Sequence, residues 1–233
     1  MNVLIPMAGL GTRVGGGHLP KPLVQVSGQP MIRLVVDALG LENRYVFVVR
    51  EEDDDRFNFD NLLRRFVGDF EVVRVPRLTE GAACTALCAS SLIDNDEPLL
   101  LTVCDAVNDL GANWQAVCLE CGADGLIFCF ESDKPGYSYV KSGENGLVEE
   151  VAEKRVISKL ATSGNYFWSR GSEFVRYTKR MVDENYRVNN EFYLAPAYNF
   201  AIKDGKRIVT QIARQVNDLG TDAGISLFAA TAK

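Results

Sequence analysis

The sequence has no long apolar run, no excess of basic residues and a single histidine. Its 233 residues hold 25 Lys and Arg against 31 Asp and Glu, which gives a net charge of -6. Binding to nucleic acid or to an anionic membrane over a broad face needs clustered Lys and Arg, so this balance argues against both partners. Residues 1–9 lack the basic start and the apolar middle of a signal peptide. We therefore expect a cytoplasmic protein.

Disulfide pairs and zinc ligands are also not indicated. The six cysteines mostly stand among apolar neighbours, which in a chain of this size is typical of reduced, packed thiols. Cys118 and Cys121 form one CxxC, but no second CxxC and no histidine pair exists to complete a zinc site. We expect these two thiols to face the core from one helix.

Strand-like runs alternate with helix-like runs over the first 130 residues. Nearly continuous apolar runs, typical of strands covered on both faces, lie at 2–8, 44–50, 70–75, 98–104 and 124–130. Helical spacing of apolar residues lies between them, at 30–40, 59–68, 81–93 and 113–122. This alternation predicts an α/β fold of three αβα layers around a predominantly parallel sheet.

The pattern changes after Tyr137. Residues 137–154 are typical of two strands around a Glu-Asn-Gly turn, and further strands are expected near 162–169 and 207–213. Helices are expected over 172–184 and within 191–202, whereas the acidic run at 51–55 is most simply a solvated loop. Because no low-complexity linker or internal repeat divides the chain, we expect one domain over residues 1–233 with a small β-rich addition.

A glycine-rich loop follows the first strand, but it fits neither common phosphate-binding motif. A dinucleotide fingerprint starting at Gly9 fails because Val14 stands where its third glycine should be. A Walker loop fails because Gly16 and Gly17 are followed by His18 instead of Lys and Ser or Thr. His18 is interpreted as a local contact of the loop.

The remaining feature of this loop is Gly-Leu-Gly-Thr-Arg at 9–13. Its backbone N–H groups can wrap a polyphosphate, since glycine has no Cβ to hold the main chain away from a ligand. Arg13 and Lys21 add fixed positive charge beside it. An ordinary βα loop would explain the glycines, but it would not explain two cations and the prolines on either side of Lys21. The loop therefore predicts a phosphate site.

Five segments, in order, resemble the sugar-phosphate nucleotidyltransferases. They are PMAGLGTRVGGGHLPKPLVQVSGQPMI at 6–32, LTEGAACTAL at 78–87, LTVCDA at 101–106, VEEVAEK at 148–154 and NDLGTD at 217–222. The compact single-domain type of capsule, lipopolysaccharide and phosphocholine pathways is the most similar. The resemblance implies a Rossmann-like, GT-A-like domain with a nucleotide-binding part at about 1–135 and an acceptor-binding part at about 136–233. We expect no C-terminal β-helix domain of the kind that longer bifunctional members carry.

The reaction implied by the resemblance is transfer of a nucleoside monophosphate from a nucleoside triphosphate to a sugar-1-phosphate or a similar small phosphorylated acceptor, with release of pyrophosphate. Both reactants are anions, so charge compensation and in-line positioning must supply most of the catalysis. Arg13 would bind the β and γ phosphates, and Lys21 would neutralise charge around the α phosphate. Mg²⁺ would be held by Asp105 and Asp218, although either carboxylate could instead cap a turn or helix. The family also implies a homo-oligomer.

Nucleotide binding is assigned by the resemblance to two segments of the chain, with the base contacted by Ala8, Gly9 and residues 80–82. The positions are Ala8, Gly9, Leu10, Gly11 and Thr12 of the loop, and Glu80, Gly81 and Ala82 of the second segment. The glutamine that thymidylyl- and uridylyltransferases carry before this glycine is missing from PRLTEG, so the base is left open. Glu80 could accept from an exocyclic amine, which favours cytosine, or could cap the following helix.

Acceptor binding is assigned by the resemblance to Tyr139, Glu153, Lys154, Gly164 and Asn165. In the family pair, lysine binds the acceptor phosphate and glutamate binds a hydroxyl, whereas a charged strand edge is the simpler explanation of both residues. A cytidylyltransferase for a non-sugar phosphate remains an alternative.

Two further alternatives are less consistent with the sequence. A GT-A glycosyltransferase would need Asp-x-Asp, but Asp105 and Asp109 have the wrong spacing. A non-catalytic nucleotide-binding protein is disfavoured because Arg13, Lys21, Asp105, Lys154 and Asp218 are all present.

Overall fold

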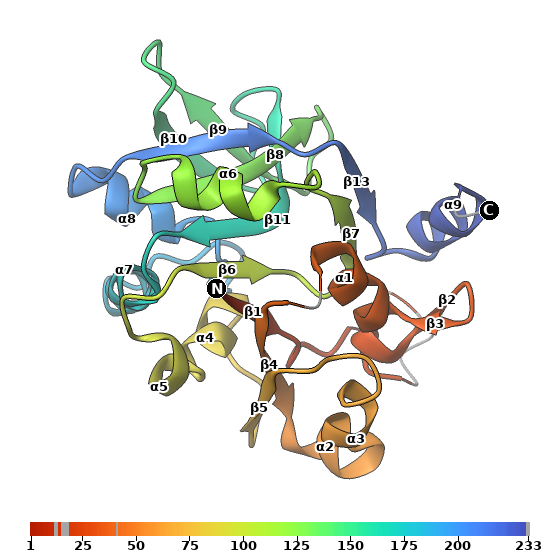
Figure 1. Ribbon diagram of the computed structural model, residues 1–233. Helices are drawn as coiled ribbons and strands as arrows, with labels where there is room; N and C mark the ends of the chain where they lie inside the picture. The colour runs from red at the N-terminus through yellow and green to blue at the C-terminus, as the bar shows by residue number, and fades with distance from the viewer. Residues whose placement is uncertain (12–13, 15–18, 41, 232–233) are drawn as a thin grey trace.

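A computed structural model describes residues 1–11, 14, 19–40 and 42–231 of the chain (Figure 1). The main sheet has the strand order β10-β9-β11-β6-β1-β4-β5, and β8 pairs with both β11 and β12. These strands are β1 (Asn2–Pro6), β4 (Arg44–Arg50), β5 (Phe70–Val75), β6 (Leu99–Thr102), β8 (Gly125–Glu131), β9 (Ser138–Ser142), β10 (Val148–Glu153), β11 (Leu160–Trp168) and β12 (Ile208–Ile212). Two small antiparallel ladders join β2 (Gln25–Val26) to β3 (Gln29–Pro30), and β7 (Ala106–Asp109) to β13 (Gln215–Asp218).

Helices cover both faces of the main sheet, which gives the three predicted layers. One face packs against α1 (Met31–Leu39), α3 (Phe59–Leu63) and α6 (Trp114–Glu120). The other face packs against α4 (Ala82–Leu87), α5 (Ser90–Ile93), α7 (Gly171–Asp183) and α8 (Ala197–Lys203). Side chains of a strand alternate between the two faces of a sheet. In β1, Leu4 therefore belongs to the core on the side of α7 and α8, while Val3 and Ile5 belong to the core on the side of α1 and α6.

The predicted α/β fold is confirmed, but its sheet is mixed. Strands β6, β1, β4 and β5 are parallel neighbours, whereas β11 runs antiparallel to β6, β8 and β9. Parallel neighbours need a crossover connection, usually a helix. The described chain between β8 and β11 contains only the β9–β10 hairpin, so β11 returns in the opposite direction.

The acidic run at 51–55 is helical, so its prediction as a loop was wrong. It forms α2 (Glu51–Phe57), whose first turn holds four carboxylates, and negative charge at a helix N-terminus is favourable. Asp53 is buried against Arg50, with an Nε–Oδ2 distance of 2.9 Å. Asp54 accepts from the backbone N–H of Phe59 at 2.8 Å, which ties the end of α2 to the start of α3. Local capping and pairing therefore outweigh the mutual repulsion of the run.

Two further predictions, on the cysteines of the CxxC and on membrane-spanning segments, can be compared with the described residues. Cys118 and Cys121 both contact the core beside α6, as predicted, and burial raises the pKa of the Cys118 thiol well above its ordinary value. No helix within the described ranges is long and apolar enough to cross a membrane.

Strand connectivity places a crevice beside β1. The chain runs from β1 to β4 and then β5 on one side, and then returns to β6 on the other side of β1. In open α/β sheets, ligands bind where the strand order reverses, outside the carboxyl ends of the strands. The segments that follow β1 and β6 should therefore meet a common ligand.

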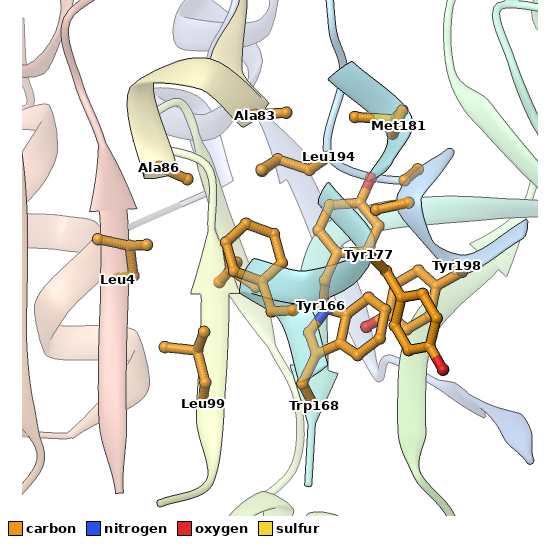
Figure 2. Packing of buried hydrophobic residues seen from close by; sticks show 14 of the residues in the cluster. Leu4, Ala83, Ala86, Leu99, Tyr166, Trp168, Tyr177, Met181, Leu194 and Tyr198 are labelled. Atoms are coloured by element: carbon orange, nitrogen blue, oxygen red, sulfur yellow. The ribbon is translucent and has the colours of Figure 1, made fainter. Parts of the chain in front are cut away.

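One buried cluster of the core includes Trp168, at the end of β11 (Figure 2). Its ring is 1% exposed and stacks on Tyr198 of α8, with ring centroids 4.2 Å apart and planes at 7°. Tyr177 of α7 stacks less closely, at 6.1 Å. Stacked aromatic pairs stabilise a core beyond the area they bury, so these rings join α7 and α8 to the sheet.

Replacing Trp168 with Ala should lower the free energy of unfolding by about 3–5 kcal/mol, because it leaves a cavity and removes both stacked pairs. Urea denaturation followed by circular dichroism would measure the change. Leu227→Ala is the control, because Leu227 is 69% exposed on α9 (Asp222–Thr231) and should change stability by less than about 0.5 kcal/mol. Equal urea midpoints for the two variants would contradict this account of the core.

Candidate active site

A cleft of about 440 Å³ lies at the predicted crevice. It is lined by Pro6, Met7, Gly9, Leu10, Gly11, Lys21, Leu78, Thr79, Gly81, Ala82, Thr85, Val103, Cys104, Asp105 and Glu191. Its walls come from the segments after β1 and β6, as the strand order requires, and from the start of α4. A second cavity, of about 210 Å³, shares Val103 and Asp105 with this cleft. Asp105 therefore stands between two spaces.

The described part of the glycine loop packs directly on the segment that carries Lys21. Gly11 has a φ of +62°, and a Cβ at this position would lie 2.6 Å from the Cβ of Lys21. Only a residue without a side chain permits this approach together with a left-handed backbone. Gly9, Leu10 and Gly11 line the cleft, whereas Ala8 is buried in the core. Thr12 and Arg13 fall outside the described residues, as does His18.

Lys21 begins the short 3-10 turn η2 (Lys21–Leu23), between two prolines. The fixed φ of proline restricts the backbone on either side of the lysine. Lys21 is only 9% exposed, and its ammonium forms an ion pair with the Oδ2 atom of Asp105. The residue that was predicted to neutralise phosphate charge thus lies beside a predicted metal ligand.

The two predicted metal ligands are brought together by the β7–β13 ladder. In this ladder Asp218 pairs with Ala106, and the N–H of Leu219 donates to the carbonyl of Asp105 at 2.8 Å. Distances from the Cβ position of Gly220 show how close the two carboxylates lie. A Cβ on Gly220 would lie 2.9 Å from Asp218 Oδ1, 3.0 Å from Asp105 Oδ2 and 3.6 Å from the ammonium of Lys21. Residues 113 positions apart in the chain therefore face one small space, which is kept open by a glycine.

Asp218 is held through both of its carboxylate oxygens. The backbone N–H of Gly220 donates to Oδ1 at 2.8 Å, and the hydroxyl of Tyr137 donates to Oδ2 at 3.3 Å. Partial burial raises the pKa of Tyr137, and the charge of Asp218 raises it further, so the phenol stays protonated and remains a donor. Tyr137 was not among the predicted site residues. Its only sequence signal was its place at the start of the second, β-rich part of the chain.

This pair of carboxylates fits a magnesium ion that shares its coordination with substrate phosphates. Mg²⁺ is usually bound through one or two carboxylates and completes its octahedron with phosphate oxygens and water. Across the ranges that the structure describes, no group of three His, Cys, Asp or Glu side chains is placed to hold a metal by itself. The neighbouring Cys104 is an unsuitable ligand or nucleophile, because burial and the charge of Asp105 raise its pKa to about 12.

The far end of the large cleft is formed around Gly81. Its φ is +127°, and a Cβ there would lie 2.7 Å from the backbone nitrogen of Phe192, so the position requires glycine. Gly81 and Ala82 line the cleft as predicted, but Glu80 does not, since its carboxylate pairs with Arg187 at 2.9 Å. The polar side chains that do line this end include Thr79 and Thr85, whose hydroxyl oxygens are 2.5 Å apart.

Two of the five predicted acceptor residues line the smaller cavity, and three do not. Glu153 and Gly164 line the smaller cavity. The hydroxyl of Tyr139 donates to the carbonyl of Lys134, and the Asn165 side chain is buried between Thr102 and Asn108. Neither of these side chains lines the cavity. The ammonium of Lys154 contacts Tyr193, lies 4.4 Å from the centre of its ring and does not line the cavity.

The comparisons with known proteins agree with this fold. Together these features define a Rossmann-like domain that is suited to binding nucleotides. Residues 3–159 match the MobA-like NTP transferase domain, and the chain belongs to that family. The predicted membership of the nucleotidyltransferase class is confirmed.

The relatives are longer proteins. The chain is 29% identical over 210 residues to bifunctional protein GlmU of Thermotoga petrophila. The aligned segment covers 87% of this chain and 45% of that protein. The chain is 25% identical over 238 residues to bifunctional protein GlmU of Cupriavidus taiwanensis, which covers 97% of this chain and 50% of that protein. The chain spans about half the length of these curated relatives.

Two solved structures share the fold over nearly their whole length. A nucleoside-diphosphate-sugar pyrophosphorylase from Vibrio cholerae RC9 has a TM-score of 0.84 and 21% identity, with 98% of this chain and 99% of that chain covered. A UDP-glucose pyrophosphorylase complexed with UDP-glucose has a TM-score of 0.78 and 19% identity, with 99% and 97% covered. At these identities the likeness shows the fold alone.

Gly220→Ala should weaken metal binding while leaving the protein folded. The new methyl group would displace the ends of two flexible carboxylate side chains, which costs little stability but closes the space between them. We expect the affinity for Mn²⁺ to fall at least about tenfold, as measured by calorimetry with thermal unfolding as the check on folding. Gly68→Ala is the control, since nothing lies within 4 Å of its Cβ position. Unchanged Mn²⁺ affinity would exclude this space as the metal site.

Tyr137→Phe removes only the hydroxyl that holds Oδ2 of Asp218. Loss of a residue that orients a metal ligand typically weakens binding 10- to 100-fold, and the 3.3 Å bond places the expected loss near about tenfold. Calorimetric titration with Mn²⁺ would measure it, with the exposed Tyr186→Phe as the matched control. Equal affinities in both variants would show that the hydroxyl does not position Asp218.

Proposed function

We propose that the chain transfers a nucleoside monophosphate from a nucleoside triphosphate to a small phosphorylated acceptor, with sugar-1-phosphates as the first class to test. The observation that carries this proposal is the position of Lys21, Asp105 and Asp218 around one space between the large cleft and the smaller cavity. A triphosphate in the first space and an acceptor phosphate in the second would meet at these charges.

In this reaction an acceptor phosphate oxygen attacks the α phosphorus. The new phosphorus–oxygen bond forms as the bond to the leaving pyrophosphate breaks. Mg²⁺ would supply positive charge to the phosphates from the side of Asp105 and Asp218. Lys21, already held near this space, would stabilise the charge that develops around the α phosphorus, and Arg13 would bind the departing phosphates. No side-chain nucleophile is required, which agrees with the protonated state of Cys104.

The nucleotide would lie along the described loop and the start of α4. Nothing lies within 4 Å of the Cβ position of Gly9, so the backbone there leaves room for a close approach of the base and ribose, and Gly11 and Gly81 line the same cleft. The preference for cytosine that was based on Glu80 loses its support, because that carboxylate is paired with Arg187 outside the cleft. The hydroxyl pair of Thr79 and Thr85 is the alternative polar contact, and a hydroxyl both donates and accepts hydrogen bonds.

The test is pyrophosphate release in the presence of Mg²⁺, with CTP, UTP, dTTP, ATP and GTP each combined with a panel of phosphorylated acceptors. For the productive pair, Lys21→Ala should lower kcat by about 100-fold or more, because it removes a fixed charge from the transition state. Lys179→Ala is the control, since Lys179 is exposed on α7 and pairs with Asp94 away from both cavities. Near-normal turnover in Lys21→Ala would reject the proposed role. Nucleotide binding without release from any pair would favour a non-catalytic nucleotide-binding protein.

A further inference from the structure

The smaller cavity has an unbalanced charge. Its lining residues are Val103, Asp105, Ala106, Phe130, Gly136, Tyr137, Ser138, Glu153, Thr162, Ser163, Gly164, Tyr166, Val216, Asp218, Gly220 and Thr221. These described residues include three carboxylates and no Lys, Arg or His. Two of the carboxylates, Asp105 and Asp218, face the metal space, and Lys21 already pairs with the first. Glu153 is the third carboxylate, and it is not one of the predicted metal ligands.

Glu153 has no cationic partner among the residues that the structure describes. Its Oε2 accepts from the hydroxyl of Ser138, and that is the contact that holds it. Burial raises the pKa of this carboxyl, although the Ser138 hydrogen bond and the charge of Lys154 oppose the rise. Glu153 is partly buried, and an ionised carboxylate that is partly removed from water without an opposite charge is destabilised, so a ligand that brings a positive charge would be favoured here.

The neighbouring lysine is turned away from this cavity. Lys154 follows Glu153 at the end of β10 with a φ of 55°, and its backbone N–H donates to the carbonyl of Tyr137 at 3.0 Å. Its ammonium contacts Tyr193 outside the cavity. The acceptor space therefore receives the glutamate of the Glu-Lys pair without the lysine.

Aromatic rings complete the surroundings of Glu153. Phe130 and Tyr137 meet edge to face, with centroids 5.2 Å apart, and both line the cavity together with Tyr166. The hydroxyl of Tyr166 lies 2.9 Å from that of Thr162, which also lines the cavity. The faces of aromatic rings attract ammonium groups, and a carboxylate adds a charge-assisted hydrogen bond. A site with both features suits a small organic cation.

We propose that the acceptor is a phosphate monoester that also carries an ammonium group, with its phosphate toward Asp105 and its ammonium toward Glu153. This proposal rests on the proposed nucleotidyl transfer and specifies its acceptor. Two sources share the chemistry: a phosphorylated amino alcohol or amino acid, and an amino sugar phosphate. A neutral sugar phosphate could offer Glu153 a hydroxyl, but a hydroxyl would not compensate its charge.

The experiment compares acceptors that differ only in the group presented to Glu153. Phosphoethanolamine is paired with 2-hydroxyethyl phosphate, and glucosamine-1-phosphate is paired with glucose-1-phosphate. With the triphosphate that supports pyrophosphate release, the ammonium member of one pair should have a kcat/KM at least about 30-fold higher, since a buried, hydrogen-bonded charge pair contributes that much. The pair that shows this preference identifies the source.

Glu153→Gln keeps the shape and the hydrogen bond to Ser138 but removes the charge. It should abolish the ammonium preference, mainly by raising KM for the ammonium member. Glu149→Gln is the matched control, because Glu149 lies on the same strand, is exposed and faces Lys141. The proposal is overturned if the hydroxyl members react as well as the ammonium members, or if the preference survives in Glu153→Gln.

A binding measurement separates this proposal from the failure of the proposed reaction. If no acceptor gives pyrophosphate release, calorimetry with phosphoethanolamine and 2-hydroxyethyl phosphate still compares the two groups in the same cavity. Tighter binding of phosphoethanolamine that is lost in Glu153→Gln would support the ammonium site without catalysis. Equal affinities for the two phosphates would reject it.

Discussion

The electrostatic repulsion between the carboxylates of Asp105 and Asp218 is the constraint on which the site depends. A short ladder between β7 and β13 brings these carboxylates to one space, and like charges at such a separation repel each other. The ammonium of Lys21 offsets part of this repulsion through its ion pair with Asp105. A divalent cation could offset the rest. The site is therefore built around a deficit of positive charge, which suits it to reactants that arrive with a metal.

One of these two carboxylates connects the two cavities. Asp105 lines both, so a group bound in either space is within reach of the same charges. The larger space is bordered by glycine-dependent backbone, and the smaller one by carboxylate and aromatic side chains. The walls of the two spaces would thus favour different ligands. The larger space would suit flat, phosphate-rich ligands, and the smaller space compact, cationic ones.

Much of this arrangement could be predicted from the sequence, because strands and phosphate loops depend on local signals. The apolar runs predicted the strands around β1, and the resemblance to the nucleotidyltransferases implied that Asp105 and Asp218 would share one metal. The parts that were missed depend on which groups pair, close in the chain for the acidic run and far apart for Glu80. The acidic run is helical because Arg50 and the backbone of Phe59 use its carboxylates, and Glu80 leaves the cleft because Arg187, 107 residues away, pairs with it. Neither partner could be assigned from spacing alone. The positive φ of Lys154 likewise depends on the packing of the hairpin.

The two tryptophans of the chain occupy opposite sides of the central sheet. Trp168 belongs to the layer formed with α7 and α8, whereas Trp114 begins α6 and belongs to the layer formed with α1. Both are nearly inaccessible to water, at 1% and 6% exposed. Each layer thus contains its own intrinsic fluorophore, away from the residues that line the two cavities. The emission of the unmodified protein therefore comes from both layers, and a change in two steps on unfolding would show that the two layers of the core melt in sequence.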